Sequence, residues 1–249
     1  MAKRSTKMAT PSVKKRWRFN PFRWFFRLLF WAFCAVVLLQ LWYLGQIALW
    51  THVNPSSTSF MQNRLEEIRK TEPGFKLKHQ WVPYDQISLN LKRAVVAAED
   101  SGFVDHKGVE LEAIELAIKR NAKRGRVTHG GSTITQQLAK NLFLTPQRSY
   151  VRKAQELVIA LMIEALWDKR RILEVYLNVV EWGNGVYGAQ AGAQHHFGVN
   201  AAQLSSHQAA RMAGMLPAPR YFDKRRNSPY LARKTATIQK RMYQVAVPR

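Results

Sequence analysis

The longest apolar stretch of the chain runs from Leu28 to Trp50 and contains no Asp, Glu, Lys or Arg. As an α-helix rising 1.5 Å per residue, it would be about 34 Å long, enough to cross a hydrocarbon core of roughly 30 Å. Its apolar residues occupy all sides of the helix, unlike the single apolar face of an amphipathic helix in a soluble domain. The pattern therefore predicts a single transmembrane helix over residues 28–50.

Residues 1–27 carry many Lys and Arg residues and no acidic residue. Positive charge beside a membrane span favours the cytoplasmic side, so we expect a cytoplasmic tail and export of everything after Trp50. A cleaved signal peptide is the alternative, but its apolar core would be about 7–15 residues long and would end at an A-x-A-like site. The sequence shows neither feature, so the helix is expected to remain as an anchor.

After the anchor, the pattern predicts a connector over residues 51–82 and a domain over residues 83–249. Apolar positions recur at helical spacing, and no β-type alternation of useful length is found. The expected fold class is therefore mostly α. The expected helices cover residues 59–70, 89–99, 110–120, 133–142, 189–196 and 209–215, and the longest periodic stretch covers residues 150–180.

The net charge of +23 points to a partner with negative charge: nucleic acid, anionic lipid head groups or a phosphorylated substrate. Charge alone cannot choose among these three. The single cysteine, Cys34, excludes an intrachain disulfide and a cysteine-based metal cluster. His195 and His196 are adjacent and cannot easily point to one ion from a helix, so we expect structural roles for both and no metal site.

An apolar helix is expected to end at Glu99 and Asp100, where the partial negative charge of a helix C-terminus disfavours carboxylates. Carboxylates at such a position are candidates for general acid–base chemistry. The alternative is a solvent-facing pair that merely ends the helix.

Residues 129–137 read His-Gly-Gly-Ser-Thr-Ile-Thr-Gln-Gln. The glycines permit close backbone approach, and Ser132 or Thr133 can cap the helix that follows. Amides at a helix start suit an anion, and Lys140 adds a positive charge one turn later. An ordinary capped helix is the alternative. Arg152 and Glu156 are four residues apart and are expected on one face of a helix. They form either a surface ion pair or a site in which Arg152 binds a phosphate beside Glu156, a second carboxylate.

Five segments, in order over roughly residues 80–220, together resemble glycosyltransferase family 51, the peptidoglycan glycosyltransferases. Residues 99–108 match EDxxFxxHxG, and residues 131–141 match GSTITQQLxKN. Arg152 to Glu156, with Glu164 and residues 172–178, is similar to the third motif. Residues 188–198 and 204–219 are similar to the fourth and fifth motifs.

The chain departs from the family pattern at two places. Residues 192–199 read GAQHHFGV where the fourth motif is commonly AAxxYFGK, and Gln208 stands where the fifth motif commonly has Glu. Both departures lie outside the inferred catalytic pair, so they bear on stability or partner contacts. The S-x-x-K, S-x-N and K-T-G motifs of a transpeptidase domain do not occur as a set. The resemblance is therefore to the monofunctional members of the family.

The resemblance implies a lysozyme-like fold with a larger lobe and a smaller membrane-facing lobe. It also implies polymerisation of lipid II, a lipid-linked disaccharide-peptide, into β-1,4-linked strands with inversion and release of polyprenyl pyrophosphate. Glu99 matches the general base, Glu156 a second essential carboxylate, and Lys140 and Arg152 the contacts to pyrophosphate. The remaining residues implied at the substrate are Asp100, Phe103, His106, Ser132, Thr133, Gln136, Gln137 and Asn141.

The implied location is the bacterial inner membrane, with the catalytic domain in the periplasm. The implied partners are lipid II, the growing lipid-linked glycan and the membrane; other cell-wall synthesis or division proteins and a divalent cation at the pyrophosphate are left open. Nucleic acid is not expected, because no aromatic residues are interleaved with the basic loop 119–126. A lysozyme-like glycan hydrolase and a non-catalytic cell-wall scaffold are the alternatives. A hydrolase has no use for Lys140 with Arg152.

Overall fold

The apolar run near the N-terminus forms one long helix, α1 (Pro21–Leu49), in the computed structural model, which describes residues 21–110, 131–147 and 149–249. Within these ranges α1 is the one helix long and apolar enough to cross a membrane, over Phe22–Leu49. It begins earlier than predicted and includes Arg23 and Arg27. The chain separates into two compact units, residues 1–42 and residues 43–249.

The last turns of α1 belong to the second unit and are bound to it. Ile47 is fully buried, and its carbonyl oxygen accepts a hydrogen bond of 2.8 Å from Trp167 Nε1. The Arg171 guanidinium donates to the carbonyl oxygens of Trp50, at 2.7 Å, and Val53, at 3.0 Å. A basic side chain on the free carbonyls at a helix end stabilises that end.

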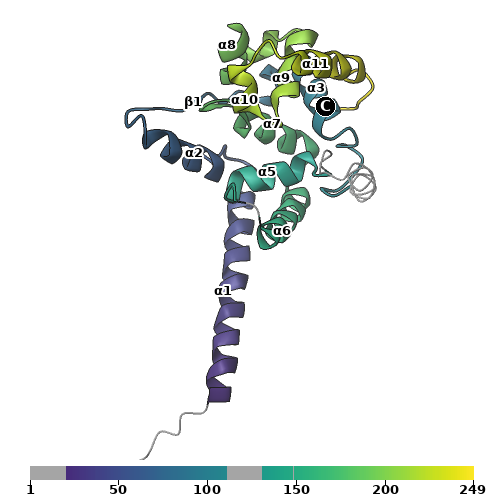
Figure 1. The fold of residues 1–249 in the computed structure, drawn as a ribbon. Helices are drawn as coiled ribbons and strands as arrows, with labels where there is room; N and C mark the ends of the chain where they lie inside the picture. Colours follow the sequence, from purple (N-terminus) through teal and green to yellow (C-terminus); the bar gives the residue numbers. More distant parts are fainter. Residues whose placement is uncertain (1–20, 111–130, 148) are drawn as a thin grey trace, which may run out of the picture. The chain divides into compact units, whose positions relative to one another are not determined.

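The second unit is mostly helical, as predicted (Figure 1). Helices α3, α9 and α11 pack against one another, and α5 packs against α2, α6 and α7. The helices are α2 (Ser59–Arg69), η1 (Tyr84–Gln86), α3 (Leu89–Glu99), α5 (Ile134–Phe143), α6 (Tyr150–Leu166), α7 (Lys169–Val179), α8 (Ala189–Phe197), η2 (Ala201–Gln203), α9 (Ser206–Met215), α10 (Pro219–Lys224) and α11 (Pro229–Arg241).

The periodic stretch predicted over residues 150–180 is two helices, α6 and α7. Asp168 caps the start of α7, because its side chain accepts a hydrogen bond of 2.7 Å from the Arg171 amide. An N-cap residue has non-helical backbone angles, so it ends the continuity of the two helices. Within α6, Ile159 and Ile163 are buried and Leu161 is half exposed.

Several elements were not predicted. A small sheet has the order β1 (Lys78–His79), β3 (Val186–Tyr187), β2 (Glu181–Gly183), with β1 parallel and β2 antiparallel to β3. Strands of two or three residues are too short to show alternation along the sequence. Helices α10 and α11 were missed as well, although Pro219 and Pro229 each stand in a first helical turn. The predicted helix 110–120, after residue 110, and the basic loop 119–126 lie outside the described residues.

The loop after α3 is fixed to the start of α5 by Asp100, which is 6% exposed. Asp100 Oδ2 accepts the Ile134 amide at 2.9 Å, and Oδ1 lies 2.8 Å from His106 Nε2. The Gly108 amide donates to His106 Nδ1 at 3.1 Å, so Nε2 carries the proton that Asp100 accepts. Thr133 caps α5 and also donates to the Gly108 carbonyl at 2.7 Å. The first two motifs therefore form one hydrogen-bonded unit.

Gly108 is required by this arrangement. Its φ of +81° is in the region that side chains other than glycine rarely adopt, and a Cβ atom there would lie 2.8 Å from Glu164 Cγ. Glu164 cannot move away easily, because it accepts hydrogen bonds from Thr135 Oγ1 at 2.5 Å and from Lys169 Nζ at 2.8 Å. The sharp turn after α3 thus depends on a glycine held between α5 and α6.

Replacing Asp100 with Asn should destabilise the domain, because two donors need acceptors at this position and the amide has one acceptor oxygen. We expect Asp100→Asn to lower the free energy of unfolding by about 1–3 kcal/mol, the usual cost of a buried unsatisfied donor. Urea denaturation of the detergent-solubilised protein measures this loss. Asp105→Asn, at an exposed position of the same loop, is the control, and equal stability of the two variants would contradict the role of Asp100.

Candidate functional site

Glu99, the last residue of α3, is partly buried and is held by a chain of neutral hydrogen-bonding groups. Its Oε2 accepts from Gln137 Nε2 at 2.9 Å, and Gln137 Oε1 accepts from the Tyr176 hydroxyl at 3.0 Å. Burial raises the pKa of Tyr176 well above its ordinary value, and the negative charges of Glu99 and Asp100 raise it further. Tyr176 therefore stays a neutral donor, and Glu99 is oriented without being paired to a cation through this chain.

A second carboxylate, Glu156, is 3% exposed and is surrounded by donors from α6. Arg152 Nη1 lies 2.8 Å from Glu156 Oε2, and Lys153 Nζ pairs with Glu156 Oε1. Lys153 Nζ also donates to Ser132 Oγ at 2.9 Å and to Gln136 Oε1 at 3.4 Å. These bonds connect the first turns of α6 to the start of α5. They satisfy the buried carboxylate, which would be costly to leave unpaired.

The charges of both carboxylates act on Lys140 of α5. Burial lowers the pKa of Lys140; the charge of Glu156 opposes this, Arg152 and Lys153 lower the pKa further, and Glu99 raises it. The charges of Glu99, Arg152 and Glu156, all singled out from the sequence, therefore act on Lys140 in the folded chain. Lys140, Gln137 and Asn141 lie on one face of α5, spaced three and four residues apart. All three line a cavity of about 170 Å³ that is also bounded by Phe60, Glu181 and Arg220.

Arg152 has a donor that the protein does not use. Its Nε is buried and has no hydrogen-bond partner among the residues that the structure describes. The guanidinium keeps its Nη1 on Glu156, and a guanidinium suits an oxyanion because its donors are fixed in a planar fork.

The other predicted site residues are buried or make hydrogen bonds that hold neighbouring segments together. Phe103 is completely buried, with Lys169 Nζ lying 4.7 Å from its ring centroid. Asp100, His106 and Thr133 make the hydrogen bonds described above, which join the loop after α3 to the start of α5. Ser132 and Gln136 hold Lys153, and Asn141 is 8% exposed at the cavity wall.

Three residues near Glu99 and Glu156 were missed by the sequence reasoning as site residues. Lys153 and Tyr176 make the hydrogen bonds given above. Lys234, on α11, is partly buried; burial lowers its pKa, and the negative charge of Glu99 opposes that shift. Lys153 could have been found from its place next to Arg152. Nothing local in the sequence indicates Lys234, because α11 reaches α3 only through tertiary packing.

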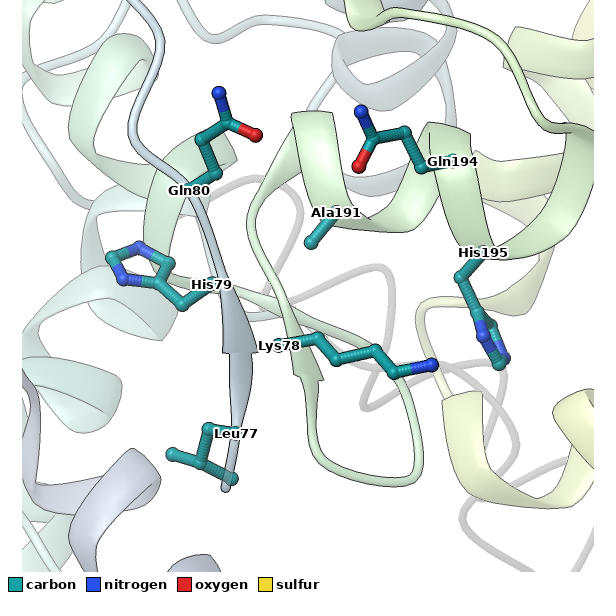
Figure 2. A pocket seen from close by; sticks show the side chains of 7 residues that line it. All are labelled: Leu77, Lys78, His79, Gln80, Ala191, Gln194 and His195. Atoms are coloured by element: carbon teal, nitrogen blue, oxygen red, sulfur yellow. The ribbon is translucent and has the colours of Figure 1, made fainter.

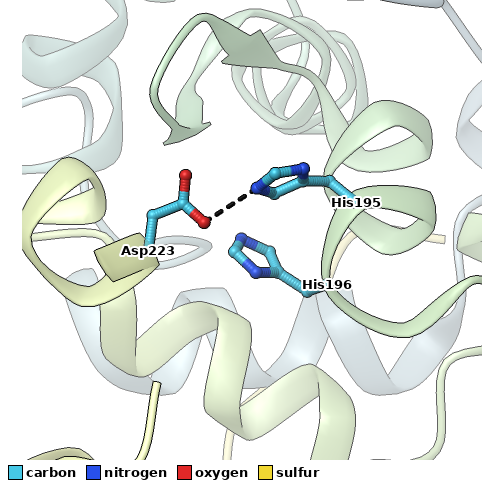
Figure 3. Close-up of side chains that lie close together, drawn as sticks. All are labelled: His195, His196 and Asp223. Carbon is cyan, nitrogen blue, oxygen red and sulfur yellow. Dashed lines mark hydrogen bonds and ion pairs between the residues drawn. The ribbon is translucent and has the colours of Figure 1, made fainter. Parts of the chain in front are cut away.

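Structural roles were predicted for His195 and His196, on the ground that adjacent residues of a helix cannot easily point to one ion; in the structure their rings do come close together. Together with Asp223 they bring one ligand atom each within 4.8 Å of the others (Figure 3). The groups are nevertheless used within the protein, since His195 Nε2 lies 2.8 Å from Asp223 Oδ1 and His196 Nε2 2.8 Å from the Trp182 carbonyl oxygen. Arg226 Nη2 also lies 3.0 Å from Asp223 Oδ1, and its positive charge disfavours a cation there.

A separate cavity of about 480 Å³ lies between β1 and α8 (Figure 2). Its wall contains Lys78, His79, Gln80, Gln194 and His195. None of the residues predicted for catalysis or substrate binding lines it. Burial lowers the pKa of His79, whose Nε2 lies 3.0 Å from the Asn178 carbonyl oxygen. The cavity is therefore distinct from the charged site around Lys140.

Comparison with known proteins places the site in a family. Residues 64–243 match the family model described as transglycosylase. A biosynthetic peptidoglycan transglycosylase of Dechloromonas aromatica (strain RCB) is 55% identical over 226 residues, covering 91% of this chain and 98% of the relative. Proteins of the same name from Janthinobacterium sp. (strain Marseille) and Azoarcus sp. (strain BH72) are 54% and 55% identical, covering 89% and 91% of this chain and 98% and 97% of the relatives. The chain therefore belongs to the transglycosylase family.

Proposed function

We propose that this peptidoglycan glycosyltransferase polymerises lipid II into β-1,4-linked glycan strands and releases polyprenyl pyrophosphate. Family membership and the names of the relatives support the glycosyltransferase activity. The observation that carries the substrate assignment is a partly buried carboxylate, Glu99, acting on the same buried cation, Lys140, as the Arg152–Glu156 pair. The proposed general base and the proposed pyrophosphate contacts therefore act on one residue, which supports a single transfer reaction.

In the proposed reaction Glu99 takes the proton from the 4-hydroxyl of the acceptor sugar. The hydroxyl oxygen forms a bond to the anomeric carbon of the donor while the bond from that carbon to the pyrophosphate oxygen breaks. The electron pair of the broken bond leaves with the pyrophosphate, and the proton stays on Glu99 until it passes to solvent. Attack opposite the leaving group converts an α-linked donor into a β-linked product, as in inverting enzymes with one base on the far face.

Pyrophosphate departs as an anion, so the leaving group needs charge stabilisation more than it needs a proton. Lys140 and the Arg152 guanidinium are the groups assigned to this task. Glu156 holds Arg152 and Lys153 in position through its two oxygens. Gln137 holds the Glu99 carboxylate through the hydrogen bond from its Nε2.

The membrane is the proposed location of the substrate's polyprenyl chain. Helix α6 exposes a row of large apolar side chains, and the residue that follows it, Trp167, is bonded to the buried end of α1. We assign this apolar face of α6 to contact with lipid beside the point where the anchor enters the domain. This would place the domain on the periplasmic face of the inner membrane, with residues 1–27 in the cytoplasm. The exposed residues are Tyr150, Val151, Leu157, Val158, Leu161 and Leu166.

A lysozyme-like hydrolase would use the same carboxylate but would shorten finished polymer. Incubation of the solubilised protein with labelled lipid II, followed by sizing of the products, separates the two functions. Longer strands support the transferase, and shorter fragments from mature glycan would contradict it. The paired cations around Glu156 favour a reaction with an anionic leaving group.

Replacement of Glu99 by Gln removes the base and keeps the shape of the side chain. We expect Glu99→Gln to lower the polymerisation rate by about 10²–10⁴-fold, the usual contribution of a general base. Binding of lipid II should change little. Labelled lipid II gives both quantities, and Glu66→Gln, on the exposed side of α2, is the control. Full polymerisation by the Glu99 variant would refute the assignment.

Lys140 should set the alkaline limit of the reaction. Because burial lowers its pKa, the charge on Lys140 is lost at a lower pH than for an exposed lysine, and about 10²–10³-fold in rate is lost with it. Lys140→Arg keeps its charge to higher pH, so its pH–rate profile should extend further into the alkaline range. The exposed Lys76→Arg should leave the profile unchanged. If the rate of Lys140→Arg fell at the same alkaline pH as that of Lys76→Arg, this would contradict a charged Lys140 in the transition state.

A negative charge on the apolar face of α6 should weaken activity in bilayers. Loss of one buried leucine contact costs about 1.5–3 kcal/mol, so we expect Leu161→Asp to reduce polymerisation in vesicles about tenfold or more. Activity in detergent, which adapts to the altered surface, should stay near that of the unchanged protein. Leu89→Asp, at an exposed leucine of α3, is the matched control. Equal activity of Leu161→Asp in vesicles and in detergent would count against lipid contact.

A further inference from the structure

The C-terminal part of the second unit carries a strong excess of positive charge. Residues 201–249 contain ten Lys or Arg residues and one acidic residue, Asp223. Helices α8 and α11 lie at the end of this unit away from α6, whose apolar face we assign to lipid (Figure 1). The proposed contacts to pyrophosphate, Lys140 and Arg152, belong to α5 and α6. Neither lipid nor pyrophosphate therefore accounts for most of this charge.

Part of the charge surrounds an open cavity of about 630 Å³ at the turn between α10 and α11. Lys224, Arg225 and Arg226 stand in its wall, and all three are exposed. The Arg225 guanidinium lies 4.5 Å from the centroid of the Tyr221 ring, which lines the same cavity. The wall therefore combines several cationic donors with aromatic surface.

The acidic residue in this wall, Asp223, is already paired within the protein. Its Oδ1 lies 2.8 Å from His195 Nε2 and 3.0 Å from Arg226 Nη2. Lys224 and Arg225 form no ion pair with the acidic residues that the structure describes. The wall thus keeps positive charge that the described part of the protein does not balance.

The pairing of Asp223 also connects this cavity to the one between β1 and α8. His195 lines the cavity of about 480 Å³, while its partners Asp223 and Arg226 line the other (Figure 3). In the cavity beside β1, the exposed Lys78 side chain extends toward His195 (Figure 2). The two cavities are therefore neighbours on one surface. We call them together the basic groove, lined by residues 77–80, 191, 194–195, 221 and 223–229.

The walls of the basic groove suit a chain with spaced carboxylates better than a single phosphate. Its cations are spread from Lys78 on β1 to Arg225 after α10, so they do not converge on one point. A carboxylate can accept two parallel hydrogen bonds from a guanidinium. The amides of Gln80, Gln194 and Asn227 stand in both cavities and can pair with peptide N–H and C=O groups. A peptide segment rich in Asp or Glu offers both kinds of partner.

We propose that the basic groove is a docking site for an extended acidic segment of another exported protein. Charge complementarity selects this occupant, and the distance of α8 and α11 from α6 separates it from membrane lipid (Figure 1). No residue assigned to the reaction lines the groove, so a docked partner would leave Glu99 and Lys140 to the substrate. The inference goes beyond the proposed function and takes from it only the export of the domain.

The test measures binding of a fluorescein-labelled peptide, in which Glu alternates with Ser, to the full-length protein in detergent. Fluorescence anisotropy gives the Kd. We expect Lys78→Glu with Arg225→Glu to raise this Kd about tenfold or more, the usual effect of losing hydrogen bonds to charged groups. The matched control is Lys70→Glu with Lys240→Glu, which changes the net charge equally at exposed positions outside the groove. It should raise the Kd by less than about twofold, because distant exposed charges are screened by salt.

Several outcomes would contradict the proposal. An equal loss of binding in the two double variants would show attraction to net charge alone. If Arg225→Glu weakened binding and Lys78→Glu did not, the occupant would not span both cavities, and an extended segment would be refuted. Phosphatidylglycerol added to the micelles and inorganic polyphosphate test the other anions. If either displaced the labelled peptide more strongly than an unlabelled peptide of equal charge, the choice of a protein segment would be wrong.

A benzophenone at the centre of the peptide shows where it lies. Cross-links to β1, α8 or the turn after α10 support the groove, whereas cross-links confined to α5 or α6 would place the peptide at the charged site and overturn the proposal. The Lys78 and Arg225 variant should polymerise lipid II at the rate of the unchanged protein. A lower rate would refute a role separate from the reaction. Failure of the unchanged protein to polymerise lipid II would refute the proposed function and leave the peptide result standing.

Discussion

The buried carboxylate of Asp100 is the constraint on which the site depends. Its Oδ2 accepts a hydrogen bond from the Ile134 amide at the start of α5, and its Oδ1 accepts one from His106 Nε2 in the loop after α3. Because Glu99 is next to Asp100 in the chain, these two hydrogen bonds fix the end of α3 against α5. Gln137, Lys140 and Asn141 project from the same helix α5. The base and the cation therefore keep their spacing through one rigid connection instead of through a flexible loop.

Charge is concentrated in this region and is balanced locally. Lys140 loses solvation on burial, and the negative charges of Glu156 and Glu99 partly compensate for this loss. Arg152 and Lys153 neutralise Glu156, which would otherwise be an isolated buried charge. An arrangement with surplus cations and fixed anions can receive a departing pyrophosphate without large movement, since its dipoles and charges are already oriented.

Where the chain departs from the family pattern, the residues that are present make hydrogen bonds within the fold. Gln208 stands where glutamate is common, yet its Oε1 accepts the Ser205 amide at 2.9 Å and completes the capping box of α9. A glutamine can fill this role because the box needs an acceptor three residues after the cap, and charge is secondary. His195 and His196 bind Asp223 and a main-chain carbonyl. These positions therefore serve the packing of α8 against α10 and the hairpin.

The sequence by itself determined the long apolar helix near the N-terminus, the mostly α class, a Ser or Thr cap at the start of α5, and the short-range pair Arg152–Glu156. Each of these depends on residues within a few positions of one another, where periodicity and capping act. Only the tertiary structure decided the small sheet, the effect of the Glu99 charge on Lys234, and the ion pair between Arg64 and Glu181. Those features join residues far apart in the chain, and no local pattern encodes which distant side chains will meet in a packed interior.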